Sequence, residues 1–231
     1  MSSTIDSMTT AQVNAVRATI TPARMSTYDI ATPKDLGTEH TRTALKLYLW
    51  NAELAQAFMV PLHLCEVAIR NAAADAIAAH YGKKWPWSDG FRTALPKPSG
   101  HGYSAHADLV RTAAKEKTPG KVIPELKFVF WQKMFTSRHD AALWDQQLHQ
   151  VLPNADPATS VSDLRGRAYN DLDRIRLLRN RIAHHEPIFT RDLCADLIAI
   201  HELLALRCED TKHVSVAAEH VSDLLTRRPG S

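Results

Sequence analysis

The amino-acid sequence predicts an all-α protein, and three observations support this fold class. Only 8 glycines and 12 prolines occur among 231 residues, so few positions favour turns over helices. Apolar residues recur at spacings of three and four along most of the chain, which is the helical period. No stretch alternates apolar and polar residues as a half-buried strand does. With 45% hydrophobic and 23% charged residues, the chain can bury a sizeable core.

The predicted elements follow from helix start and stop signals. We expect residues 1–26, rich in Ser and Thr, to form a flexible N-terminal arm with at most one short helix. Residues 27–231 are expected to form one helical domain. Its predicted helices cover, in order, residues 39–60, 62–81, 105–117, 125–135, 140–153, 161–185, 191–206 and 214–226.

Prolines, glycines and caps set these boundaries. Pro61 separates the first two helices and Gly82 ends the second. Ser104 is suited to cap the third helix, which Pro119 is expected to stop. Pro124 suits the first turn of the fourth. The intervening stretch, residues 82–104, is expected to be mostly irregular.

The sequence also predicts a cytoplasmic protein. It contains no run of 18 apolar residues, and its N-terminus lacks a basic start followed by an apolar stretch. Its three cysteines, Cys65, Cys194 and Cys208, are an odd number on apolar helix faces, so we expect reduced thiols in the core. We expect no membrane association.

Positive charge is concentrated near the C-terminal third of the chain. Residues 165–191 contain seven arginines, no lysine and three acidic residues, whereas the net charge of the whole chain is only +3. A guanidinium can bind a phosphate through two parallel hydrogen bonds. The segment therefore predicts contact with phosphates, and the alternative is a solvated helix face.

The same segment contains the cleanest helical pattern in the chain. Apolar residues step by four, four, three, three and four, which defines one buried face. They are Leu164, Ala168, Leu172, Ile175, Leu178 and Ile182. Arg179, Asn180 and His184 form a polar edge away from that face, and Asn180 and His184 stack because they are four residues apart. We expect the helix to end near His184 or His185.

This polar edge has the side chains needed to cleave RNA. His184 can take or give a proton near neutral pH, and Arg179 can stabilise negative charge on a phosphate. Asn180 can hold a ligand oxygen or orient the imidazole. Attack by the 2′-hydroxyl of RNA on its own phosphate needs no metal, so we expect no metal and no cofactor. The structural alternative is that histidines are simply favoured at a helix C-terminus by its dipole.

The chain resembles the Abi-like (abortive infection) branch of the HEPN superfamily, over roughly residues 20–205. The motif Arg179-Asn180-x-x-x-His184 has the form R-polar-x-x-x-H that marks this superfamily. Further segments that carry the resemblance are Pro22-Ala23-Arg24 with Tyr28, residues 47–51 (LYLWN), residues 62–71 (LHLCEVAIRN), residues 128–131 (FVFW), residues 143–144 (LW) and residues 178–189 (LRNRIAHHEPIF).

The resemblance implies an HEPN-like helical bundle with additional N-terminal helices, acting as a metal-independent endoribonuclease. Such domains are commonly toxins or phage-defence effectors, with the motif at the interface of a homodimer, and some have a neutralising protein or RNA antitoxin. It implies that Arg179 and His184 are catalytic, with Asn180 as their polar partner. We expect Arg174, Arg176, Arg181 and His185 to bind RNA phosphates.

Other assignments stay open at this point. Glu66, Arg70 and Asn71 could line the same cleft, or Glu66 and Arg70 could form an ordinary ion pair on a helix. A non-catalytic RNA-binding module and a helical dimerisation domain are alternatives to the ribonuclease. The first predicts salt-dependent binding without cleavage, and the second predicts no RNA binding.

Overall fold

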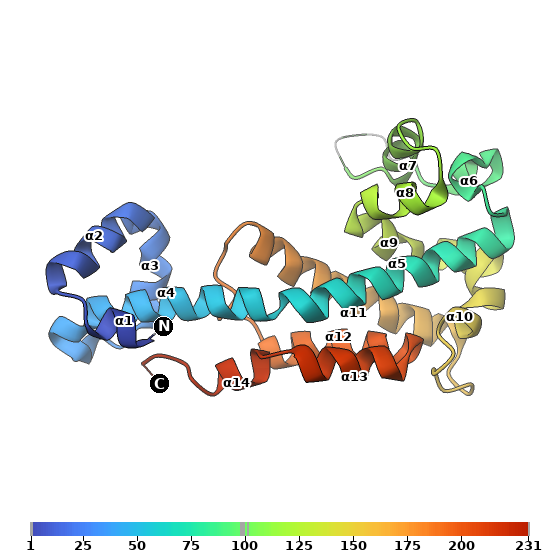
Figure 1. Ribbon diagram of the computed structural model, residues 1–231. Coiled ribbons are helices and arrows are strands. Elements are labelled where there is room, and N and C mark those ends of the chain that lie inside the picture. The colour runs from blue at the N-terminus through green and yellow to red at the C-terminus, as the bar shows by residue number, and fades with distance from the viewer. Residues whose placement is uncertain (1, 98–99, 101, 231) are drawn as a thin grey trace. The chain divides into compact units, whose positions relative to one another are not determined.

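The computed structural model describes residues 2–97, 100 and 102–230, and all regular elements among these residues are helical (Figure 1). The α-helices are α1 (Ser2–Asp6), α2 (Thr10–Ile20), α3 (Pro22–Ala31), α4 (His40–Ala57), α5 (Met59–Tyr81), α6 (Asp89–Ala94), α7 (Ala105–Ala113), α8 (Pro119–Glu125), α9 (Phe128–Met134), α10 (Asp145–Val151), α11 (Val161–Ala183), α12 (Leu193–Arg207), α13 (Glu209–Ala218) and α14 (Val221–Leu225). Short 3₁₀ segments are η1 (Lys34–Glu39), η2 (Trp85–Trp87) and η3 (Ser137–His139), and η4 (Asp140–Trp144) is π-helical. The prediction of an all-α fold is confirmed.

The chain divides into two compact units, each made of segments that are distant in the sequence. Unit 1 comprises Met1–Met59, Leu178–Leu197 and Glu219–Ser231. Unit 2 comprises Val60–Leu177 and Ile198–Ala218. The divisions between the units fall inside α11 and α12, which each supply buried residues to both units, whereas α5 gives unit 1 only its exposed first residue, Met59. The single domain expected over 27–231 stays a prediction.

The N-terminal residues of unit 1 are helical where the sequence predicts a flexible arm over residues 1–26. Thr9 caps α2 through a capping box. Ile5 and Val13 are buried in a cluster with Leu45 of α4. The Ser and Thr content that suggests a loose arm is typical of caps and exposed helix positions. Met8, Val16 and Ile20 of the same segment also pack against this cluster.

Helix α4 forms the centre of unit 1. It packs against α3 and α14, and Trp50 Nε1 donates a hydrogen bond to the carbonyl oxygen of Leu224 at 2.8 Å (Figure 1). The sequence predicts the break between the first two long helices at Pro61, but α4 ends at Ala57 and α5 begins at Met59. Pro61 is buried in the first turn of α5, where a residue needs no backbone N–H for the helix.

Aromatic residues form the core of unit 2. The rings of Phe135 and Trp144 stack with centroids 4.6 Å apart, and Trp85 packs edge-on against Phe91 and Trp131. Several boundaries differ from the predictions here. Pro119 begins α8 instead of only stopping the preceding helix, since proline is well suited to a first helical turn. The segment predicted as one helix over 214–226 is split between α13 and α14.

One stretch passes a test for a membrane-crossing helix by length and composition. Residues His40–Tyr81 contain an 18-residue window whose mean hydropathy is 1.3, and 33% of that window is buried. Core helices of soluble proteins pass the same test. The absence of a membrane span thus stays a prediction.

The three cysteines are all free, but they do not all lie in the core. Cys65 is buried, Cys208 is half-buried and Cys194 is exposed. The prediction of three core thiols is therefore wrong for Cys194, which lies in the first turn of α12 on its exposed side.

Candidate functional site at the end of helix α11

Helix α11 has the buried face that its spacing predicts. Five of the six apolar residues in the stripe, from Leu164 to Leu178, are at most 2% exposed. The sixth, Ile182, is half-buried and lines a pocket of unit 1. The last helical turn therefore leaves its core-facing side partly open.

The helix ends in a Schellman motif. The backbone N–H of Glu186 donates to the carbonyl oxygen of Arg181 at 2.8 Å, and that of His185 donates to Ile182 at 3.0 Å. His185 adopts a φ of +54°, the left-handed conformation that this motif requires and that glycine usually supplies. The sequence prediction that α11 ends near His184 or His185 is confirmed.

The segment after the helix is held by a buried side chain of α4. Asn51, 5% exposed, accepts hydrogen bonds on Oδ1 from the backbone N–H groups of Ile188 at 2.7 Å and Phe189 at 3.2 Å. These residues belong to separate segments that carry the HEPN resemblance. Asn51 thereby fixes where the chain leaves α11.

Two arginine side chains donate hydrogen bonds to backbone carbonyl oxygens just after the end of α11. Arg24 of α3 donates to the carbonyl oxygen of His185 at 2.9 Å. Arg181 donates through one nitrogen to the carbonyl oxygen of Pro187 at 3.0 Å. Arg181 therefore holds the helix end, and its predicted role in binding phosphate stays a prediction.

The predicted catalytic side chains are accessible to solvent. Arg179 and His184 are exposed, and Asn180 is half-exposed. Because a helix turns about 100° per residue, Arg179 and His184 project about 140° apart, and Asn180 lies between them, closer to His184. The two side chains thus flank the end of α11 from different sides.

The helix terminus itself opposes phosphate binding. The C-terminal end of a helix carries partial negative charge and disfavours an anion by about 0.3–1 kcal/mol. A phosphate bound here would depend on cations that outweigh this term, and Arg179 is an exposed cation at this end.

The predicted phosphate-binding residues Arg174 and Arg176 belong to unit 2. Arg176 donates to Asp173 at 2.7 Å, and Asp173 also accepts a hydrogen bond from Gln132 at 2.7 Å. The hydrogen bond from Arg176 lowers the pKa of the Asp173 carboxyl, with a further contribution from Gln132. The charge of Arg176 is therefore already offset by a carboxylate.

Other arginines of this segment are paired as well. Arg165 pairs with Asp140, Arg167 with Glu202 and Arg191 with Asp196. These carboxylates lie outside residues 165–191, so a count along the sequence does not include them. The excess of positive charge in the segment is consequently smaller on the folded surface than in the sequence.

Glu66 and Arg70 form the ion pair that the sequence offers as the simpler alternative. Arg70 donates to Glu66 Oε1 at 2.7 Å and to the carbonyl oxygen of Pro124 at 3.4 Å, and Asn71 is exposed. All three candidates belong to unit 2, whereas Arg179 and His184 belong to unit 1. Their place in a common cleft stays a prediction.

A pocket of about 480 Å³ lies beside the end of α11 in unit 1. We call it the α11 pocket, and its lining comes from α3, α4, the start of α5 and the end of α11. Its lining residues are Tyr28, Tyr48, Asn51, Ala52, Ala55, Gln56, Met59, Ile182, Ala183, His185 and Glu186. Some of these residues, such as Tyr28 and Asn51, lie in the segments that carry the HEPN resemblance, but the pocket itself is created only by tertiary packing.

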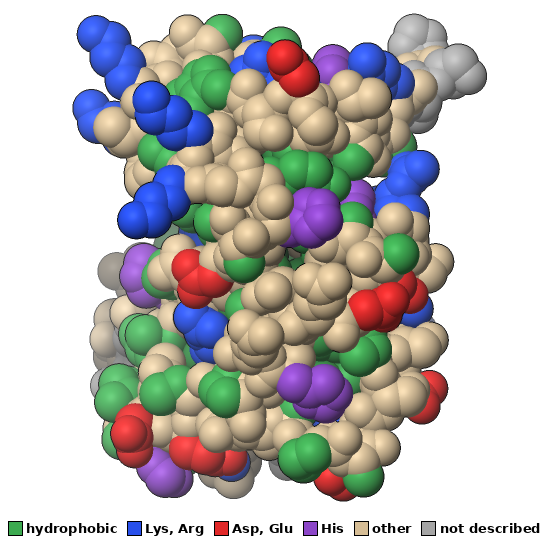
Figure 2. All heavy atoms as spheres, turned by 90° about the vertical axis from the view of Figure 1, so that its right-hand side faces the viewer, with side chains coloured by type: hydrophobic (Ala, Val, Ile, Leu, Met, Phe, Trp, Pro, Cys, Tyr) green, Lys and Arg blue, Asp and Glu red, His purple; other side chains and the backbone are tan. Residues whose placement is uncertain are grey.

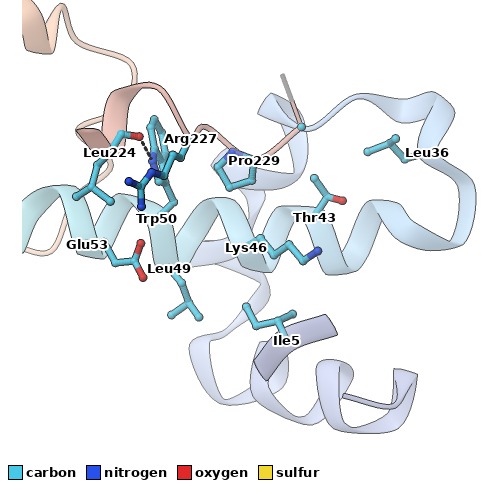
Figure 3. Close-up of a pocket in the computed structure, with 11 residues that line it drawn as sticks. Ile5, Leu36, Thr43, Lys46, Leu49, Trp50, Glu53, Leu224, Arg227 and Pro229 are labelled. Atoms are coloured by element: carbon cyan, nitrogen blue, oxygen red, sulfur yellow. Dashed lines mark hydrogen bonds between the residues drawn. The ribbon is translucent and has the colours of Figure 1, made fainter. Parts of the chain in front are cut away.

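A second cavity of unit 1, about 420 Å³, lies between α4 and the C-terminal segment (Figure 3). Trp50 and Leu224 form part of its wall, and Lys46, which also lines it, pairs with Asp6. None of the predicted site residues lines this cavity.

The chain contains a second basic segment, which the prediction from residues 165–191 does not include. Residues 83–133 contain ten basic and four acidic residues, a larger excess than that of residues 165–191. On the face shown in Figure 2, Lys and Arg side chains gather in the upper part, where α6, α7 and α8 of unit 2 lie in Figure 1. A charge count over every window of the chain would have found this segment.

The described residues contain no group of three His, Cys, Asp or Glu side chains that could hold a metal ion. Comparisons with protein-family models, with curated proteins and with solved structures find no match to this chain.

Proposed function

We propose that this protein is a metal-independent endoribonuclease of the HEPN type. The observation that supports the proposal is the exposure of Arg179 and His184, with Asn180 between them, at a helix end that is fixed by hydrogen bonds. Side chains on a rigid, well-anchored helix can be held in a productive geometry. The resemblance over residues 20–205 adds the reaction class.

The reaction requires a base and an acid. The base removes the proton of the 2′-hydroxyl, whose oxygen attacks the adjacent phosphorus. The bond from phosphorus to the 5′-oxygen breaks, and the acid protonates that oxygen. The products are a 2′,3′-cyclic phosphate and a 5′-hydroxyl. His184 would act as base or acid, and Arg179 would stabilise the charge on the phosphate oxygens.

A homodimer would complete such a site. One chain supplies a single His184, and its Arg179 projects about 140° away around the helix. A twofold axis near the end of α11 would bring a second His184 and a second Arg179 to the same phosphate. An excess of His184→Ala protomers should then suppress wild-type cleavage beyond simple dilution. Suppression by dilution alone would contradict a shared site.

The decisive test is cleavage of bulk RNA in the presence of a chelator. Wild-type protein should yield 2′,3′-cyclic phosphate ends, and His184→Ala should lower the rate by about 10²–10⁴-fold. Arg179→Ala should lower it by about 10²–10³-fold. The matched control is His220→Ala, an exposed histidine elsewhere in unit 1. Equal rates for wild type and His184→Ala would overturn the proposal.

The cellular role that we propose is that of a cytoplasmic toxin or phage-defence effector, held inactive by a protein or RNA antitoxin. Expression of the wild type should then slow growth, and expression of His184→Ala should not. Equal growth with both chains at equal expression would contradict a toxin that acts through this site.

One observation favours RNA binding without cleavage as the second candidate. The larger basic excess lies in residues 83–133, which belong to unit 2, whereas His184 belongs to unit 1. A binding module would keep its affinity for RNA in His184→Ala and would produce no cyclic phosphate ends. Helical dimerisation without RNA binding would leave both assays negative.

A further inference from the structure

The α11 pocket contains a buried polar group that no part of the described chain satisfies. Tyr28 lines the pocket and is fully buried, and its hydroxyl group has no hydrogen-bond partner. Such a group normally costs free energy in a folded protein unless a ligand or water satisfies it. Burial raises the pKa of Tyr28 to about 12, with a further contribution from Tyr48, so the hydroxyl stays protonated and is available to donate a hydrogen bond to a ligand.

A second donor lies in the same lining. Asn51 uses its side-chain oxygen for the backbone of Ile188 and Phe189, which fixes the amide orientation. Among the described residues, none accepts a hydrogen bond from its NH₂ group, so this group is available to a ligand. The lining therefore includes two donors, on Tyr28 and Asn51, and its other residues are mostly apolar or aromatic, with Gln56, His185 and Glu186 as polar exceptions.

This combination selects for a flat, neutral molecule with hydrogen-bond acceptors on its edge. The volume of about 480 Å³ is in the range of small-molecule sites. An anionic ligand would lose its hydration against Ala52, Ala55 and Ile182 and would meet the carboxylate of Glu186, which also lines the pocket. A nucleobase has the required shape, π-face and edge acceptors.

We propose that the α11 pocket binds a nucleobase of the RNA that lies next to the cleaved phosphate. The inference rests on the proposed ribonuclease function, because it is His184 that places a phosphate here. His185 and Glu186, the next two residues, line the pocket. A base unstacked from the strand could thus enter the pocket while its own phosphate lies at the end of α11.

Tyr28→Phe is the sharpest test, because it separates ligand binding from folding. Removal of a hydroxyl group that has no partner should leave the melting temperature unchanged or higher. It should nevertheless weaken nucleobase binding by about three- to tenfold. If the hydroxyl had a purely structural role, Tyr28→Phe would lower the melting temperature and leave nucleobase binding unchanged.

Binding is measured without cleavage, by NMR titration of the wild-type protein with the four nucleoside 3′-monophosphates. Shifts should centre on the backbone amides that line the α11 pocket, and Ala55→Phe, which fills it, should abolish them. The control is Leu36→Phe in the other cavity of unit 1. Shifts that Ala55→Phe leaves unchanged, or no shifts at all, would overturn the inference.

The outcomes separate this inference from the ribonuclease itself. Binding of nucleotides without any RNA cleavage would support the pocket and reject the proposed function. RNA cleavage by Ala55→Phe at wild-type rate and with unchanged base preference would support the ribonuclease and reject the pocket. If Ala55→Phe instead prevents dimerisation, the pocket holds a second copy of the chain and the inference is wrong.

Discussion

The side-chain oxygen of Asn51 accepts a hydrogen bond from the backbone N–H of Ile188 at 2.7 Å, across 137 positions of the chain. The bond joins α4 to the segment that follows the candidate catalytic helix. It is buried, and a neighbouring bond from Phe189 shares the same acceptor. The position of the helix end therefore depends on a residue that is far from it in sequence.

Replacement of Asn51 by leucine should destabilise unit 1. Two buried backbone N–H groups would lose their acceptor, at a cost of about 1–3 kcal/mol for each group in the free energy of unfolding. Urea unfolding measures this change, with Asn14→Leu, an exposed position on α2, as the control. Asn51→Asp keeps the acceptor oxygen and should lose less. Equal stability of Asn51→Leu and Asn14→Leu would show that these bonds contribute nothing.

Replacement of His185 by glycine should stabilise the end of α11. A residue with a side chain at φ +54° carries a conformational cost that glycine does not have. We expect a gain of about 0.5–1 kcal/mol, seen as a higher melting temperature. His184→Gly, one residue earlier and outside the left-handed region, should be destabilising. A fall in melting temperature for both variants would indicate that contacts of the His185 side chain outweigh the strain.

Helix α11 shows which part of the site could be predicted from sequence. Its single apolar stripe predicts which face of the helix is buried, and Pro187 predicts where the helix ends. Both signals are local in the sequence. The contact from Asn51 to Ile188 could not be predicted, because it exists only once α4 and the segment after α11 pack together. The α11 pocket could not be predicted for the same reason, because its lining comes from four helices.

Charge and domain organisation were harder to predict, for physical reasons that the arginines illustrate. Arg165 and Arg167 appear unopposed along the sequence, yet each meets a carboxylate from another segment, Asp140 and Glu202. The N-terminal helices lack a strong apolar stripe, and only contacts such as that of Ile5 with α4 reveal that they pack. Both the charge left on the surface and the packing of the N-terminal helices thus depend on contacts between segments that are distant in the sequence.

His139 should make unit 2 less stable in mild acid. Burial lowers its pKa from the ordinary value of 6.5 to about 4, with a smaller contribution from Arg138. Between these values the unfolded chain binds a proton that the folded chain does not, so stability falls as pH decreases from about 6.5 towards 4. We expect a loss of about 2 kcal/mol between pH 7.5 and pH 5.

Urea unfolding at the two pH values measures the effect. His139→Gln should remove most of this pH dependence, whereas His213→Gln, an exposed histidine of α13, should not. If the wild type, His139→Gln and His213→Gln all showed the same pH dependence of stability, groups other than His139 would cause it.

The basic segment 83–133 should contribute to RNA affinity. Lys115 and Lys117 are exposed at the end of α7, and replacing both by alanine removes two positive charges from this surface. If both contact phosphates of single-stranded RNA, the slope of log affinity against log salt should fall by about 1.4. Fluorescence anisotropy with a His184→Ala background avoids cleavage during the measurement.

The control for this pair is Lys212→Ala, a lysine of α13 that pairs with Glu209. Its loss should change neither the affinity nor the salt slope. An unchanged slope in the Lys115/Lys117 variant would show that these two lysines do not contact RNA phosphates. The other basic residues of the segment and the arginines of residues 165–191 would then be the remaining candidates.

The three thiols should differ in reactivity. A hydrogen bond from the Thr211 side chain lowers the pKa of Cys208, so a larger fraction is thiolate near neutral pH. Burial raises the pKa of Cys65 and also blocks access. Limited alkylation with iodoacetamide at pH 7.5, followed by mass spectrometry, should modify Cys208 first, exposed Cys194 next and Cys65 only after unfolding. Thr211→Val removes the side-chain donor and should slow the alkylation of Cys208 without affecting that of Cys194. Rapid modification of Cys65 in the folded protein would show that the core around α5 opens, because a closed core protects a thiol from the reagent.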